Sequence, residues 1–209
     1  TVTSYILSIG FGLIIAVIGA FFIRNIHLNP DENKDFYYAS MEKIFGVLMI
    51  ITAAAMAFAH GSNDVANAIG PLAAIYSVID SGGMVSSKSA LPLWILFVGG
   101  VGIAVGLITY GHKVIATIGT GITQLTPSRG FAATLAAAAT VVIASGTGIP
   151  VSTTQVLVGA VLGVGIARGM AALDTRVIRG IFLSWIVTLP AGAFMSILFF
   201  FALKTIFGA

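Results

Sequence analysis

Two polar stretches of this 209-residue chain interrupt long apolar runs, and their side chains are of the types that bind ions in proteins. The first, residues 60–71 (HGSNDVANAIGP), contains an aspartate, two asparagines and a serine. The second, residues 146–155 (GTGIPVSTTQ), has three consecutive hydroxyl side chains soon after a proline. They are termed the first and the second polar segment. A carboxylate in a hydrocarbon environment costs several kcal/mol, so Asp64 is not expected to serve packing.

The spacing within these segments indicates what they could bind. Each precedes an apolar run that predicts a helix, and a helix start presents unpaired N–H groups and a positive dipole end, which suit an anion. Unwound carbonyls, together with Asn, Ser and Thr oxygens, suit a hard cation such as Na⁺, and membrane transporters combine both at broken helices. Asn63 lies four residues before Asn67, and Asp64 three, so a helix places all of them on one face.

Each segment also has a purely structural interpretation. In the first, the serine or an asparagine would only cap a helix and Asp64 would be a first-turn charge. In the second, the hydroxyls would satisfy backbone groups left open by Pro150, while Gln155 either points into a site or bonds across helices. His60 is interpreted as a hydrogen-bonded structural residue. Four polar groups together in a membrane favour a binding site for the first segment.

Composition places both segments in a membrane. The chain is 58% apolar and only 8% charged, against roughly 25% charged residues in a soluble domain. This predicts an all-α polytopic protein that passes several times through the cell membrane. The net charge of +3 comes from residues at segment ends, so it indicates topology and not nucleic-acid binding. Without cysteine there is no disulfide framework and no cysteine metal site.

The apolar runs predict the elements, within a single transmembrane domain over residues 1–209. Residues 44–80 are expected to form a helix broken at the first polar segment, because a straight helix would be about 54 Å long against a core of about 30 Å. Residues 129–170 predict a helical hairpin, preferably re-entrant, alternatively two short tilted spans. Gly102 and Gly106 offer a face for close helix contact. The remaining expectations are spans over 4–23, 90–111 and 180–203, a polar loop over 24–43 and an interfacial piece over 112–125.

The first polar segment, with Phe58 and Ala59 before it, resembles the G-x-N-D-V-A-N-A signature of the inorganic phosphate transporter (phosphate permease) family, in the form found in its C-terminal half. Residues 148–154 resemble the P-V-S-T-T motif of that family, and residues 126–131 (TPSRGF) resemble another of its stretches. Together they cover most of residues 40–170. The chain departs from the family at Gln155, often a histidine, and at residues 132–134 (AAT), where many animal members have a glutamate.

The resemblance implies a secondary active transporter of inorganic phosphate driven by a cation gradient, with Na⁺ favoured as the coupling ion and no cofactor. H⁺-coupled symport of phosphate or metal-phosphate is the alternative within this class, a passive anion channel is the alternative outside it, and an enzyme is not expected. The family has two inverted halves. The chain is therefore expected to be one half of an inverted-repeat transporter, with the missing N-terminal half as its partner and homo-oligomeric assembly in the lipid bilayer.

By this resemblance the two segments face each other across the site. Phosphate is expected to be bound by Asp64, Asn67, Ser152, Thr153, Thr154 and Gln155, and Na⁺ by Asn63, Asp64, Asn67, Ser152 and Thr154. Because Asp64 would repel phosphate, two arrangements stay open. Either Na⁺ lies between the carboxylate and phosphate, or Asp64 accepts a hydrogen bond from a protonated phosphate oxygen. The second would also reject sulfate, which has no such proton at neutral pH.

Overall fold

The computed structural model describes residues 2–24, 26, 33–84 and 91–208, and every regular element in these ranges is helical. Two π-helical turns, Leu107–Gly111 and Thr117–Gly121, and the 3₁₀ turn Met170–Ala172 accompany the α-helices. Four helical rods, α2, Leu93–Gly121, α5 and α7, are long and apolar enough to cross a membrane. The predicted all-α polytopic class is confirmed. The α-helices are α1 (Val2–Arg24), α2 (Lys34–Asp80), α3 (Leu93–Gly106), α4 (His112–Ala116), α5 (Pro127–Thr147), α6 (Thr153–Ala167) and α7 (Thr175–Phe207).

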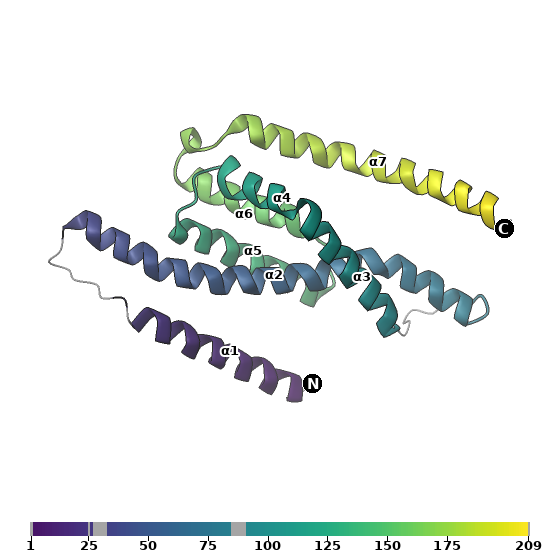
Figure 1. Cartoon of the computed structure of the whole chain (residues 1–209), viewed down its shortest axis with the longest axis horizontal. Coiled ribbons are helices and arrows are strands. Elements are labelled where there is room, and N and C mark those ends of the chain that lie inside the picture. Colours follow the sequence, from purple (N-terminus) through teal and green to yellow (C-terminus); the bar gives the residue numbers. More distant parts are fainter. Residues whose placement is uncertain (1, 25, 27–32, 85–90, 209) are drawn as a thin grey trace.

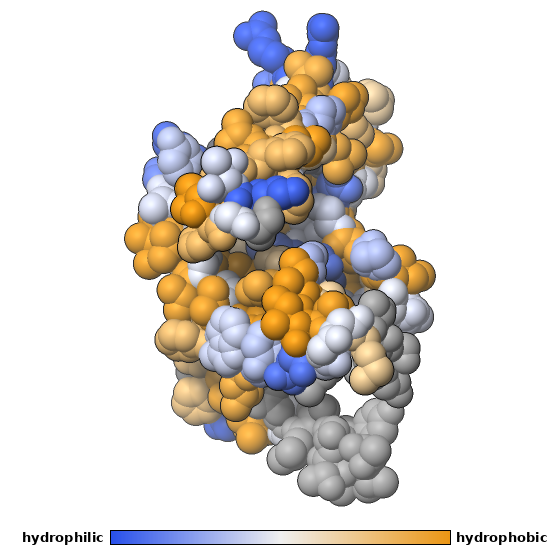
Figure 2. Space-filling model, turned by 90° about the vertical axis from the view of Figure 1, so that its right-hand side faces the viewer, coloured by the Kyte–Doolittle hydropathy of each residue, from blue (hydrophilic) through white to orange (hydrophobic). Residues whose placement is uncertain are grey.

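The helix α2 is the long element on which α1, α3 and α5 pack (Figure 1). α5 and α6 run antiparallel and form the hairpin, whose connection reaches the middle of α2. α7 packs through its first turns on α6 and on the segment before α5, and its remaining length is exposed. Figure 2 shows large apolar areas on one face of the molecule, as expected for helices surrounded by lipid.

The predicted break at the first polar segment is wrong, because α2 runs as one helix from Lys34 to Asp80. At about 1.5 Å per residue it is about 70 Å long, more than twice the bilayer core. The polar side chains do not require the backbone to open, since other groups satisfy them. Ser62 Oγ donates to the Ala59 carbonyl within the helix at 3.0 Å, and Asn63 reaches the hairpin. Even Pro71 lies inside the helix.

The predicted polar loop and the predicted interfacial piece are both helical in part. The polar loop over 24–43 gives way to helix at Lys34, where Asn33 Oδ1 accepts a hydrogen bond from the Asp35 backbone N–H at 3.4 Å. Residues 25 and 27–32 of that loop lie outside the described residues. The piece predicted to be interfacial continues α3 as a helical rod to Gly121, through two π turns. The polar residues of 24–43 favour a loop, but they do not prevent a helix from forming there.

The hairpin forms as predicted over residues 129–170, and α5 begins earlier than its expected arm, at Pro127. Small residues let α5 lie close to α2: Met56 and Ala59 pack against Ala137, Ala138 and Val141 in one buried cluster. At about 32 Å, α5 is long enough to cross a bilayer core, whereas α6 measures about 23 Å. Re-entry of the hairpin stays a prediction.

Close contact between α2 and α3 depends on a glycine that the small-residue pattern did not single out. A Cβ at Gly99 would lie 2.5 Å from Ile69 Cγ2 and 3.3 Å from Val65 Cγ1. At Gly102 and Gly106, the predicted pair, a Cβ would meet no atom within 4 Å. Gly99, Gly102 and Gly106 are spaced i, i+3 and i+7 and share one face of α3, so the close contact lies on the predicted face but almost one helical turn earlier along the helix.

Candidate functional site

The second polar segment forms a tight turn that ends at the start of α6. Gly148 ends α5 in the left-handed conformation, with φ of 73°, and its N–H donates to the Ser145 carbonyl. Ser152 is the N-cap of α6, and its Oγ accepts from the Gln155 N–H at 3.4 Å. Within the described residues, the backbone N–H groups of Thr153 and Thr154 donate to no protein acceptor. The α6 start therefore presents free donors, as predicted.

Asp64 of the first polar segment contacts this helix start directly. Thr153 Oγ1 donates to Asp64 Oδ1 at 2.9 Å, although the two residues are 89 positions apart. Thr153 is only 2% exposed, whereas the side chain of Asp64 is 35% exposed. The carboxylate therefore lies at the edge of the packed interior, with one side held by the hairpin and another open.

Asn63 connects both sides of the hairpin connection to α2. Its Nδ2 donates to the Val151 carbonyl at 3.0 Å and to Asp64 Oδ1 at 3.4 Å. Its Oδ1 accepts from Ser145 Oγ at 3.3 Å. Asn63 is 9% exposed, and a buried amide with both ends paired fixes the position of the segments that it joins. The two polar segments are thus brought together, as the sequence predicts.

His60 lies one helical turn before Asp64 and pairs with it. The distance between His60 Nε2 and Asp64 Oδ2 is 2.6 Å. Together with Thr153 and Asn63, this gives the carboxylate three donors, distributed over both of its oxygens. The interpretation of His60 as a hydrogen-bonded residue agrees with this contact, and its partner is the most polar group of the segment.

Of the other predicted ligands, Asn67 lies beside an open hollow of about 270 Å³ between α2 and the hairpin connection. Asn67 lines this hollow together with Ser62, Asn63 and Ser145. The side chains of Ser152, Thr154 and Gln155 are exposed at the first turn of α6, and within the described residues none of them forms a hydrogen bond with Asp64. Of the predicted set, the structure joins Asn63, Asp64 and Thr153, and leaves the rest facing outward.

Two groups of the site were missed by sequence reasoning. Ser145 donates to Asn63, and the Val151 carbonyl accepts from it. Ser145 ends the alanine-rich run immediately before the second polar segment, so a hydroxyl at that boundary was an available signal. No side-chain pattern could have identified a backbone carbonyl, because its exposure depends on how the turn folds.

The arrangement can bind charged groups of either sign. The Val151 carbonyl and Asp64 Oδ1 both accept from Asn63 Nδ2, so these two oxygens lie near each other, and hard cations prefer carboxylate and carbonyl oxygens. The free N–H groups of α6 and the neighbouring hydroxyls can bind an anion. Within the described part of the chain, no cluster of three or more His, Cys, Asp or Glu residues offers a transition-metal site.

Comparison with known proteins gives consistent matches. The sequence profile of the Phosphate transporter family matches residues 1–196. A Haemophilus influenzae protein named "Putative phosphate permease" is 60% identical over 199 residues, which are 93% of this chain and 47% of the relative. A Pyrococcus furiosus protein with the same description is 48% identical over 171 residues, 82% of this chain and 41% of the relative.

A solved structure, "The sodium-dependent phosphate transporter", superposes with a TM-score of 0.75 at 40% identity. The alignment covers 90% of this chain and 46% of the solved chain. The chain therefore spans about half the length of the curated relatives and of the structure that it matches.

Proposed function

The chain belongs to the phosphate transporter family, whose members are transporters and not enzymes, and we propose that it forms part of a secondary active transporter of inorganic phosphate coupled to Na⁺. The similar solved protein carries sodium dependence in its name, which supports Na⁺ as the coupling ion. The relatives are about twice as long as the matched region, so the transporting unit is proposed to include a further, similar half.

The observation that carries this proposal is the hydrogen bond from Thr153 to Asp64. It places the negative group of the first polar segment beside the positive helix start of the second. A carboxylate and a helix N-terminus at one place are the parts needed to bind a cation and an anion together. Coupled transport requires that each ion change the affinity of the protein for the other, and ions bound side by side can do so directly.

Phosphate is proposed to bind at the first turn of α6. Ser152 and Thr154 are exposed there, so their hydroxyls and the Thr154 N–H can reach a ligand, and the hollow lined by Asn67 extends to Pro150, two residues before Ser152. Gln155 is exposed on the same turn and adds an amide donor. Phosphate bound in this way would replace water as the acceptor for these donors.

Na⁺ is proposed to bind at Asp64, with the Asn63 amide oxygen and, on rearrangement, the Asn67, Ser152 and Thr154 oxygens. The Asp64 oxygens now accept from Thr153, Asn63 and His60, so cation binding would displace some of these donors. After that exchange the Thr153 hydroxyl would no longer donate to Asp64, and its oxygen could bind the cation. Both arrangements for Asp64 remain: Na⁺ between carboxylate and phosphate, or a direct bond to protonated phosphate.

The proposal is tested by uptake of labelled phosphate into proteoliposomes that contain the full-length protein. We expect phosphate to accumulate against its gradient when an inward Na⁺ gradient is imposed. Accumulation driven by an H⁺ gradient alone would show that H⁺, and not Na⁺, is the coupling ion. Uptake that only equilibrates phosphate under either gradient would identify a passive channel and overturn the proposal.

The substitution Asp64→Asn tests the proposed carboxylate. We expect the Na⁺ dependence of uptake to weaken by about tenfold or more, because a charged ligand is replaced by a neutral one. Asp80→Asn is the matched control, since Asp80 is an exposed carboxylate at the far end of the same helix. Unchanged Na⁺ dependence in Asp64→Asn would show that Asp64 does not bind the coupling ion.

A further inference from the structure

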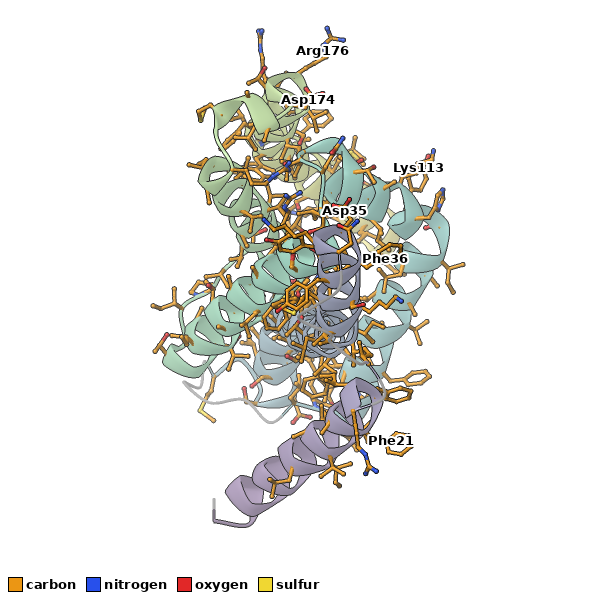
Figure 3. All side chains as sticks on the ribbon, turned by 90° about the vertical axis from the view of Figure 1, so that its left-hand side faces the viewer. Phe21, Asp35, Phe36, Lys113, Asp174 and Arg176 are labelled. Atoms are coloured by element: carbon orange, nitrogen blue, oxygen red, sulfur yellow. The ribbon has the colours of Figure 1, made fainter. Side chains whose placement is uncertain are left out.

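Arginine side chains gather at the end of the molecule where α2, α5 and α7 begin and α6 ends (Figure 1). Arg129 lies in the first turn of α5, and Arg168 directly follows α6. Arg176 and Arg179 lie in the first turns of α7 and are exposed. Figure 3 looks onto this end and shows Arg176 and Lys113 pointing away from the helices.

The segment before α5 holds two of these arginines together. Arg168 Nη1 donates to Thr123 Oγ1 at 3.1 Å and to the Gln124 carbonyl at 3.0 Å. Arg129 Nη1 donates to the same Gln124 carbonyl at 3.4 Å. The two nitrogens are therefore no farther apart than the sum of 3.0 and 3.4 Å. Two guanidinium groups, both always charged, share a single neutral acceptor.

Glu42 is near enough to Arg129 to interact with it electrostatically, but no carboxylate in the described part of the chain forms an ion pair with either arginine. No Asp or Glu oxygen there lies within 4.0 Å of either guanidinium group. Glu42 reaches the same turn of α5, but its two oxygens accept from the backbone N–H and the hydroxyl of Ser128, at 2.8 and 2.7 Å. Like charges held this close repel each other, so an anion bound between them is stabilised. Paired guanidinium groups match a phosphate group in geometry and charge.

We propose that Arg129 and Arg168 bind the phosphate group of an anionic phospholipid. Exposed apolar side chains occur at the same end of α6 and suit the acyl chains: Ile166 is 59% exposed and Met170 is 68% exposed, two residues before and after Arg168 in the chain. Basic residues at the ends of membrane helices attract anionic headgroups. The site is separate from Asp64 and the α6 start, since it lies at the opposite end of α6.

Native mass spectrometry of the full-length protein in detergent tests this site. The protein is mixed with equal amounts of phosphatidylglycerol and phosphatidylcholine, and the bound lipids are counted. We expect selective retention of phosphatidylglycerol, reduced about tenfold in the double variant R129Q/R168Q, because charge-assisted hydrogen bonds are lost. Lys204→Gln is the control, since it removes a basic residue near the other end of α7. Unchanged selectivity in the double variant would overturn the proposal.

A second variant keeps the test valid if the double variant does not fold. Arg168→Lys retains the charge but loses the planar fork, so we expect weaker retention of phosphatidylglycerol at an unchanged melting temperature. Wild-type retention in Arg168→Lys would contradict binding by the fork. Excess inorganic phosphate is added in a further arm. If it displaces the lipid, and if it raises the melting temperature of the lipid-free wild type more than that of R129Q/R168Q, the pair is a site for free phosphate and the lipid assignment is wrong.

Discussion

Asp64 and Thr153 form the contact on which the proposed site depends. The hydroxyl of Thr153 is buried and donates to a carboxylate that is partly open to solvent. Its neighbours Ser152 and Thr154 have similar chemistry, but they are exposed, and Ser152 caps its own helix. The three consecutive hydroxyls therefore have different roles. Thr153 positions Asp64, while Ser152 and Thr154 remain available to a ligand.

Thr153→Val removes the buried hydroxyl and keeps the shape of the side chain. We expect the apparent affinity for the coupling cation to fall by about tenfold, because valine has no oxygen to offer to the cation once the bond to Asp64 is exchanged. The measurement is phosphate uptake as a function of Na⁺ concentration. Thr153→Ser, which keeps the hydroxyl, is expected to behave like the wild type. A Thr153→Val protein with wild-type Na⁺ dependence would show that this bond does not serve binding.

The elements α2, α3 and the hairpin hold the site through close packing of small residues. α5 meets α2 over alanines, and α3 meets α2 where Gly99 faces Ile69 and Val65. Ile69 lies less than two turns after Asp64 on α2, so the packing of α3 bears on the same stretch that carries the site. The side chains of Ile69 and Val65 are β-branched and have little rotamer freedom in a helix, so they cannot easily move aside.

Gly99→Ala is expected to destabilise the protein by about 1–3 kcal/mol, since the added methyl group would overlap Ile69 Cγ2. Gly102→Ala is the matched control, because a methyl group there meets no atom within 4 Å. Thermal unfolding in detergent compares the two. For a chain of this size, about 1 kcal/mol corresponds to a shift of roughly 2–4 °C. Equal melting temperatures would contradict the close contact between α2 and α3.

The whole molecule leaves much of the proposed binding surface uncovered. Asn67, Ser152, Thr154 and Gln155 are exposed, and the hollow beside them is open. The chain spans about half the length of its relatives. The expected second half would supply the other wall of the site, and this prediction remains to be tested on the full-length protein.

The 209 residues contain no cysteine, so single cysteines can report which positions face water. In a full-length background without other cysteines, Thr154→Cys is expected to react with an aqueous thiol reagent, and phosphate with Na⁺ is expected to slow the reaction. Thr153→Cys is the control, because its 2% exposure predicts much slower labelling. If phosphate does not change the labelling rate of Thr154→Cys, the substrate binds elsewhere.

The sequence by itself determined the membrane class, the position of most helices and the two polar segments. These depend on local properties: the length of an apolar run and the cost of a carboxylate within it. The family resemblance came from the same segments, and the match over residues 1–196 confirmed it. The sequence could not show that α2 continues through His60 and Asn63, because a costly polar segment is equally consistent with a break.

Only the tertiary structure decided how that cost is offset. Asn63 and Asp64 find partners 82 to 89 residues away, at Ser145, Val151 and Thr153, and so α2 need not unwind. Which of three adjacent hydroxyls reaches Asp64, and that a backbone carbonyl completes the contact, depend on the turn that ends α5 at Gly148. Hydrogen bonds between distant residues are set by packing, and the spacing within either segment does not contain that information.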